Sequence, residues 1–227
     1  MSAFRNLLAS GARIVFDGAM GTVLQSRGLA PGQNPEEFCL ARPDVLEGIH
    51  NSYLEGGADV LTTNTFGGTR FKLPAGIEVQ DFNRRMAQAA RQAADKSGRQ
   101  VFVAGSIGPS GKFLYPLGEL SFDELVDAFR EQVRGLMLGG VDLIIAETQF
   151  DIAEARAIVI AVRKEGDLPV AVSMTYEDGV TLTGSSVSVC AATLWNMGVD
   201  LLGMNCSAGP VEMRDAAHEL LSVCQGP

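Results

Sequence analysis

The sequence lacks long apolar runs and clusters of basic residues, and each absence excludes a class of protein. No part of the 227 residues approaches the roughly 18 uninterrupted apolar residues of a membrane span. The formal net charge of -9 argues against nucleic acid or an anionic membrane surface as a partner. Arg5 and Arg13 interrupt the N-terminal segment, which therefore does not resemble a secretory signal. We expect a cytoplasmic protein with no nucleic-acid or membrane partner.

Residues that often carry catalysis are also scarce. Histidine occurs only as His50 and His218, both within predicted helices, so a cysteine–histidine pair is not supported. The 4 cysteines are widely spaced and form no Cys-x-x-Cys motif, which disfavours disulfides. No lysine ends a predicted strand, which disfavours a Schiff-base aldolase.

The sequence does contain a regular alternation of short β-branched runs and longer amphipathic segments. This alternation is typical of βα units on a parallel sheet. We predict strands at residues 13–16, 59–63, 100–104, 142–146, 169–174 and 200–204. The pattern predicts one α/β domain, residues 1–227, of the (β/α)8 TIM-barrel type with about six of the eight βα units.

Local signals mark where the predicted helices begin and end. Ser121 with Glu124, and Asp151 with Glu154, have the spacing of capping boxes. A Gly-x-Asp sequence recurs at residues 57–59, 140–142 and 198–200. Glycine suits the left-handed residue that ends a helix, so each copy predicts a helix end followed by a strand.

Polar residues follow every predicted strand. They are Asp17, residues 63–65, residues 105–106, residues 147–148, Thr175 and residues 205–206. The carboxyl ends of the strands of a (β/α)8 barrel form the active-site face. We therefore expect these side chains to converge on one pocket.

The segment after the first predicted strand could bind an amino acid. Gly18 and Gly21 permit a tight turn whose amides, with those of Ala19 and Met20, suit a carboxylate. Asp17 beside this turn could hold an ammonium group. An ordinary tight turn is the alternative interpretation.

Glu147 ends the fourth predicted strand, on the wall opposite Asp17. Burial would raise its pKa and make it a general acid or base, whereas a bound ammonium would keep it ionised. The alternative is a carboxylate that caps the following turn. Cys206 ends the sixth predicted strand, and it is either a metal ligand or an inert thiol.

These motifs together resemble those of the homocysteine S-methyltransferases, and most closely the N-terminal homocysteine-binding module of cobalamin-dependent methionine synthases. The matching segments are residues 17–22, 42–45, 63–67, 105–109, 147–148, 182–184 and 205–210, in the family's order. The resemblance covers nearly the whole chain. It implies a (β/α)8 barrel that transfers a methyl group to homocysteine and forms methionine.

The resemblance also implies roles for individual residues. Asp17 and Glu147 would hold the homocysteine ammonium, and the amides of Gly18, Ala19, Met20 and Gly21 its carboxylate. Asn64 and Asn205 would complete the substrate site. Cys206 would be the catalytic first of three zinc-ligating cysteines, with the homocysteine sulfur as the fourth ligand. Coordination would remove the thiol proton and prepare the sulfur for SN2 attack on a methyl group.

Three methyl donors are compatible with the resemblance. The resemblance favours methylcobalamin, but the Asp-x-His-x-x-Gly corrinoid motif is missing, because Gly48 stands two residues before His50. A corrinoid would therefore arrive on another module or protein. Betaine and S-methylmethionine are the alternative donors.

The sequence departs from the family pattern at its C-terminal end. The family's vicinal cysteine pair does not occur before Pro227, and Cys190 and Cys224 are expected in the core. We expect a C-terminally truncated barrel with an incomplete zinc site. The alternative function is a non-catalytic remnant or subunit that binds homocysteine.

Overall fold

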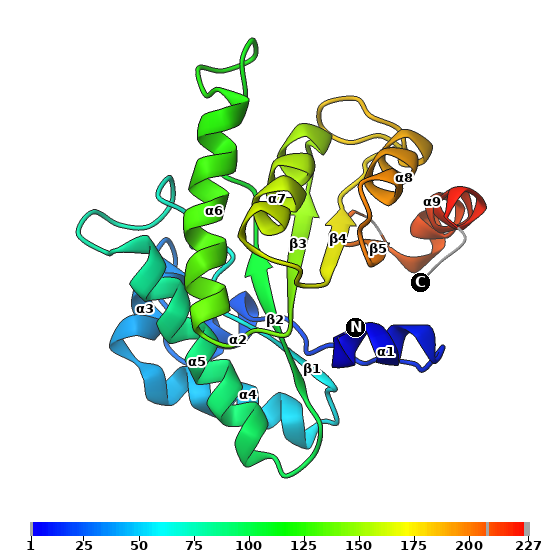
Figure 1. Cartoon of the computed structure of the whole chain (residues 1–227). Coiled ribbons are helices and arrows are strands. Elements are labelled where there is room, and N and C mark those ends of the chain that lie inside the picture. The colour runs from blue at the N-terminus through cyan, green and yellow to red at the C-terminus, as the bar shows by residue number, and fades with distance from the viewer. Residues whose placement is uncertain (1, 208, 225–227) are drawn as a thin grey trace.

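The computed structural model describes residues 2–207 and 209–224 (Figure 1). Helices alternate with strands over most of the chain, as the sequence predicts. The elements are α1 Ala3–Ala9, α2 Gly21–Ser26, α3 Pro35–Ala41, α4 Pro43–Glu55, β1 Val60–Thr62, α5 Val79–Lys96, β2 Phe102–Ile107, α6 Phe122–Leu138, β3 Leu143–Gln149, α7 Ile152–Glu165, β4 Val170–Met174, α8 Val187–Asn196, β5 Leu201–Met204 and α9 Pro210–Val223.

The five strands form one parallel sheet in the order β1-β2-β3-β4-β5. A doubly wound sheet would reverse its strand order at a switch point, whereas sequential neighbours form the wall of a (β/α)8 barrel. Helices α5, α6 and α7 follow one another along the outside of this wall (Figure 1). The predicted barrel-type fold is confirmed, and the strands of the described residues form an open wall.

The strand predicted at residues 13–16 is wrong as a strand. Phe16 makes a single parallel bridge to Val60, and the Asp59 and Val60 amides both donate to the Val15 carbonyl, at 2.7 and 3.2 Å. Val15 is 55% exposed, and the chain turns immediately into the loop that begins at Asp17. The segment is therefore too short and too exposed for a ladder, but it still extends the wall beyond β1.

Two of the other strands are displaced from their predicted bounds. The strand expected at 100–104 is Phe102–Ile107, and the one expected at 142–146 is Leu143–Gln149. Both extend further toward the carboxyl end than the β-branched runs suggest. Ser106 is polar but still pairs with Ile145 of β3. Glu147 is also polar, and it lies in β3 between Ala146 and Gln149, which both pair with β4.

Helix α1 closes the amino-terminal end of the wall. Phe4 is buried among the first residues of the strands, and its ring lies edge-to-face on Phe102 at a centroid distance of 5.3 Å. Arg5 extends this contact to the rim, where it pairs with Asp200 at 2.6 Å and Asp167 at 2.9 Å. This end of the barrel is thus filled by side chains and charge pairs.

The Gly-x-Asp recurrence has one structural role at all three positions. Gly57, Gly140 and Gly198 have φ values of +94°, +85° and +74°, the left-handed conformation that ends a helix. Each following aspartate accepts a hydrogen bond from a backbone amide of the preceding wall segment. The three bonds are Val15 N to Asp59 (3.0 Å), Val103 N to Asp142 (2.7 Å) and Val170 N to Asp200 (2.9 Å).

One of the two predicted capping boxes forms. Ser121 and Glu124 exchange both hydrogen bonds at the start of α6. Asp151 caps α7 by accepting from the Ala153 amide, but Glu154 does not reach back to it. The Glu154 carboxylate instead accepts from the buried Ser110 amide at 2.6 Å, because that amide would otherwise have no partner.

No helix in the described part of the chain combines the length and the apolar character that crossing a membrane requires.

Candidate active site

A cavity of about 660 Å³ opens at the carboxyl ends of the strands. Its wall combines the loop after Phe16 with the ends of all five strands and the start of α3. Apolar side chains cover most of it, and three carboxylates face it: Asp17, Glu36 and Glu147. None of the described residues in the wall is a lysine, arginine or histidine. The cavity therefore suits a ligand that carries a positive group.

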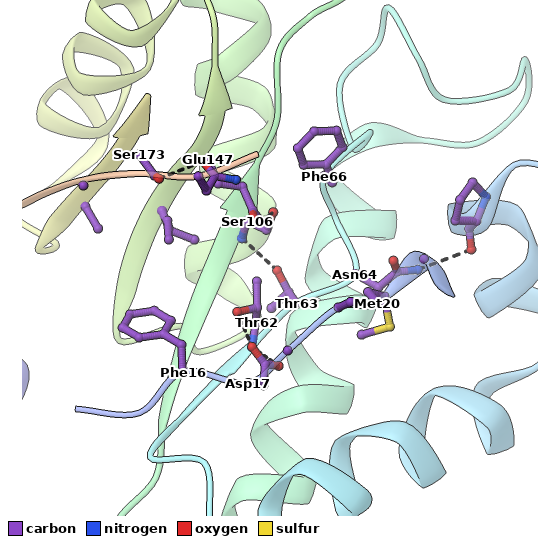
Figure 2. A pocket seen from close by; sticks show the side chains of 18 of the residues that line it. Phe16, Asp17, Met20, Thr62, Thr63, Asn64, Phe66, Ser106, Glu147 and Ser173 are labelled. Atoms are coloured by element: carbon purple, nitrogen blue, oxygen red, sulfur yellow. Dashed lines mark hydrogen bonds between the residues drawn. The ribbon is translucent and has the colours of Figure 1, made fainter. Parts of the chain in front are cut away.

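Asp17 is held by Thr62 at the end of β1. Its two carboxylate oxygens accept from the Thr62 amide at 2.7 Å and the Thr62 hydroxyl at 2.6 Å (Figure 2). Burial raises the pKa of Asp17 to about 6 against the opposing effect of these hydrogen bonds, and the charge of Glu147 raises it further. A cation placed beside Asp17 would therefore stabilise its ionised form.

Glu147 extends from β3 into the same cavity (Figure 2). Ser106, near the end of β2, donates its hydroxyl to Glu147 Oε1 at 2.5 Å. Burial raises the pKa of Glu147, and the Ser106 hydrogen bond opposes the rise. The charge of Glu147 thus disfavours the ionised form of Asp17, and an ammonium group beside both carboxylates would favour their ionised forms.

The four residues after Asp17 all line the cavity. They are Gly18, Ala19, Met20 and Gly21. None of their backbone amides donates to another described residue. Tyr53 of α4 holds this loop from behind by donating its hydroxyl to the Ala19 carbonyl at 2.7 Å.

Glu36 is a site residue that sequence reasoning missed. It lies in α3, is 5% exposed, and accepts from the Gly67 amide at 2.7 Å. A side chain at residue 67 would collide with it, because a Cβ there would lie 2.6 Å from Glu36 Oε1. The only sequence signal was the glycine that ends the 63–67 motif, which gives no indication of its partner 31 residues away.

The two asparagines of the predicted site differ in how many hydrogen bonds their side chains make within the protein. Asn64 is buried in the wall and donates to the Pro35 carbonyl at 3.3 Å. Asn205, at the end of β5, makes four hydrogen bonds with its side-chain amide, to Thr148, Ser173 and Cys206. Both asparagines contribute to the same cavity wall.

Cys206 lies at the rim, next to Asn205. It is exposed, its φ is +56°, and its sulfur lies 3.4 Å from Asn205 Nδ2 and 4.0 Å from Thr148 Oγ1. Cys190 and Cys224 are buried away from the cavity wall. The structure therefore brings together all nine predicted residues, eight in the cavity wall and Cys206 beside it.

The donor set does not fit a complete zinc centre. In residues 2–207 and 209–224, no group of three histidine, cysteine or acidic side chains could hold a metal ion. Cys206 is the one cysteine of this part of the chain that lies at the cavity rim. The described residues therefore bring one cysteine to the cavity rim, whereas the family resemblance implies three at a zinc ion.

A model of the homocysteine S-methyltransferase family matches residues 14–226. The chain belongs to the homocysteine S-methyltransferase family. Among curated relatives, the methionine synthases of Mycobacterium tuberculosis and Mycobacterium leprae are each 37% identical, over 91% of this chain. The match covers 19% of each of these proteins, so the chain spans about a fifth of their length.

Solved structures support the fold of this family member. The homocysteine methyltransferase MmuM from Escherichia coli superimposes with a TM-score of 0.84 in its oxidized form and 0.83 in its metallated form. The sequence identities are 22% and 23%, and the matches cover 98% and 97% of this chain and 83% of each MmuM chain.

Proposed function

We propose that this chain binds homocysteine in the cavity and transfers a methyl group to its sulfur, giving methionine. The observation that carries the proposal is the pair of half-buried carboxylates, Asp17 and Glu147, beside four backbone amides that have no partner among the described residues. An α-amino acid presents an ammonium and a carboxylate on one carbon atom. The site offers the complementary groups side by side.

In this proposal, different site residues bind different parts of the substrate. The ammonium lies between Asp17 and Glu147, where it offsets their mutual repulsion. The carboxylate accepts from the amides of residues 18–21, and Asn64 borders the bound amino acid. The side chain then extends along the apolar wall toward the rim, where Cys206 lies nearest to the substrate sulfur.

The chemistry at the sulfur requires loss of the thiol proton. A free thiol titrates near roughly 8.5, so at neutral pH it is mostly protonated and a poor nucleophile. The family resemblance assigns deprotonation to zinc, but the described residues do not form that centre. Cys206 is proposed as the one ligand that this part of the chain contributes.

Methylcobalamin carried by another module or protein is the proposed methyl donor. The identity to two methionine synthases that are about five times longer supports a separate donor module. Betaine and S-methylmethionine are the competing donors. Methionine formation by the zinc-loaded chain with each donor distinguishes them, and no product with any donor would count against the enzyme function.

Binding is tested separately from turnover. Calorimetry should detect homocysteine binding to the wild-type chain and a loss of at least about tenfold in affinity for Asp17→Asn and Glu147→Gln, since each removes a charge partner of the ammonium. Glu55→Gln, an exposed position on α4, is the matched control for the lost charge. Wild-type affinity in both site variants would refute the assignment.

The second candidate is a non-catalytic subunit that binds homocysteine. The incomplete donor set favours it. Metal analysis separates the two candidates: stoichiometric zinc retained by the isolated chain supports the enzyme, whereas homocysteine binding without zinc supports the subunit.

A further inference from the structure

Strand β3 contains a bulge at residues 147–148. Ala146 pairs with Val172 and Gln149 pairs with Met174, so β3 advances three residues where β4 advances two. Thr148, within this bulge, has a φ of +58°. A β-branched residue is rarely found in the left-handed region, so neighbouring groups must hold it there.

The group that holds Thr148 is the side chain of Asn205. Asn205 Oδ1 accepts from the Thr148 amide at 3.0 Å, and Asn205 Nδ2 donates to Thr148 Oγ1 at 2.8 Å. A backbone amide can only donate, so the oxygen of Asn205 must face it, which fixes the orientation of the side-chain amide. The amide and the hydroxyl of Thr148 are therefore both paired with one residue, Asn205, which directly follows β5.

Asn205 uses its remaining bonding capacity within the protein. Its oxygen also accepts from Ser173 Oγ at 2.7 Å, and its nitrogen also donates to Cys206 Sγ at 3.4 Å. A primary amide offers two donors and about two acceptor positions, so nothing remains for a substrate. Asn205 therefore differs from the cavity residues whose polar groups are free to bind a ligand.

We propose that Thr148 and Asn205 are positioning residues for the methyl-transfer site, joined as a strut between β3 and β5. The inference rests on the proposed function. Thr148 follows Glu147 directly, and Cys206 follows Asn205 directly. The 148–205 strut therefore fixes the carboxylate that receives the ammonium relative to the thiol at the rim, and Ser173 ties the intervening strand β4 to the same point.

The strut predicts a specific pattern of homocysteine affinities. Thr148→Val keeps the β-branched shape but removes the hydroxyl, which leaves one Asn205 N–H without its partner and loosens the bulge. We expect affinity to fall about tenfold. Thr148→Ser keeps the hydroxyl and should bind like the wild type. Thr193→Val, a threonine of α8 outside the cavity wall, is the control for the substitution itself.

A double-mutant cycle distinguishes positioning from general destabilisation. If the strut acts through Glu147, Thr148→Val should cause little further loss in a Glu147→Gln background, measured up to millimolar homocysteine. Additive losses, or equal affinities for Thr148→Val and Thr148→Ser, would overturn the proposal.

Hydrogen exchange tests the contact between Thr148 and Asn205 without a substrate. Asn205→Ser should increase the exchange rate of the Thr148 amide about tenfold, because its acceptor is withdrawn. Unchanged exchange overturns the strut whatever the ligand results. Failure of the wild-type chain to bind homocysteine, together with accelerated exchange in Asn205→Ser, overturns the proposed function and leaves the strut intact as a structural clamp.

Discussion

Homocysteine binding should weaken steeply below about pH 6, because protons and the substrate ammonium compete for Asp17. Burial and the charge of Glu147 place the pKa of Asp17 at about 6 in the free protein. If the ammonium binds only the ionised carboxylate, the apparent Kd rises by the factor 1 + 10^(pKa − pH). This factor is about 1.1 at pH 7 and about 11 at pH 5, so affinity should fall about tenfold between them.

The sign follows from the direction of the pKa shift. Asp17 takes up its proton at a higher pH than an ordinary aspartate, so the loss of affinity begins near neutrality rather than near pH 4. The raised pKa of Glu147 adds to the loss in the same direction. Binding at pH 5 to 6 should therefore release protons to the buffer.

Calorimetric titrations from pH 5 to 8 in two buffers of different ionisation enthalpy measure both effects. Asp17→Asn should bind weakly with a flatter pH profile. Circular dichroism at each pH ensures that only folded protein is compared. A wild-type affinity that is constant between pH 5 and 7, with no proton release, would refute the proposed competition at Asp17.

Three further outcomes concern stability. Asp17→Asn should raise the free energy of unfolding at pH 7.5 by about 1–3 kcal/mol in urea titrations, because the raised pKa means that the charged carboxyl opposes folding above that pKa. Burial lowers the pKa of His50 to about 4, so the unfolded chain binds a proton that the folded chain excludes. From pH 6.5 to pH 4 this proton should cost the folded state about 3 kcal/mol, which opposes the gain from protonating Asp17. His50→Leu should therefore be more stable at pH 4, relative to pH 6.5, than the wild type, and the exposed His218→Gln should not. Asp142→Ala should lower stability by about 2 kcal/mol, since the buried Val103 amide loses its carboxylate acceptor, while homocysteine affinity per folded molecule stays unchanged.

The sequence predicted the part of the fold that depends on repeated local patterns. Five of the six predicted strands are present, because each is a largely apolar run, buried in β1 to β4 and half-buried in β5, and its neighbours in sequence are also its neighbours in the wall. The run at 13–16 failed as a strand because it is exposed on one side. Periodicity carries no information about which side of a run will be covered.

The sequence likewise predicted the site residues that lie at the carboxyl edge of the wall, because the repeated βα pattern locates that edge. Asp17 follows the bridged residue Phe16, Glu147 lies near the end of β3 and Asn205 follows β5, so the topology brings them to one edge. Glu36 lies in a helix and reaches the cavity through a contact with Gly67, and no local pattern encodes such a pairing. Similarly, Glu154 has capping-box spacing but pairs with the Ser110 amide. The roles of the site residues in catalysis stay predictions.

The two ends of the barrel wall differ in how their charges are satisfied. At the amino-terminal end, Asp142 accepts from a backbone amide and pairs with Arg91 at 2.8 Å, and Asp200 is similarly enclosed by Arg5. At the carboxyl end, Asp17 and Glu147 repel each other with no cation among the described residues of the wall. Substitutions at the first end should therefore change stability without affinity. Neutral substitutions of the second pair should change both in opposite directions, because the repulsion that destabilises the free protein is the interaction that an ammonium ligand removes.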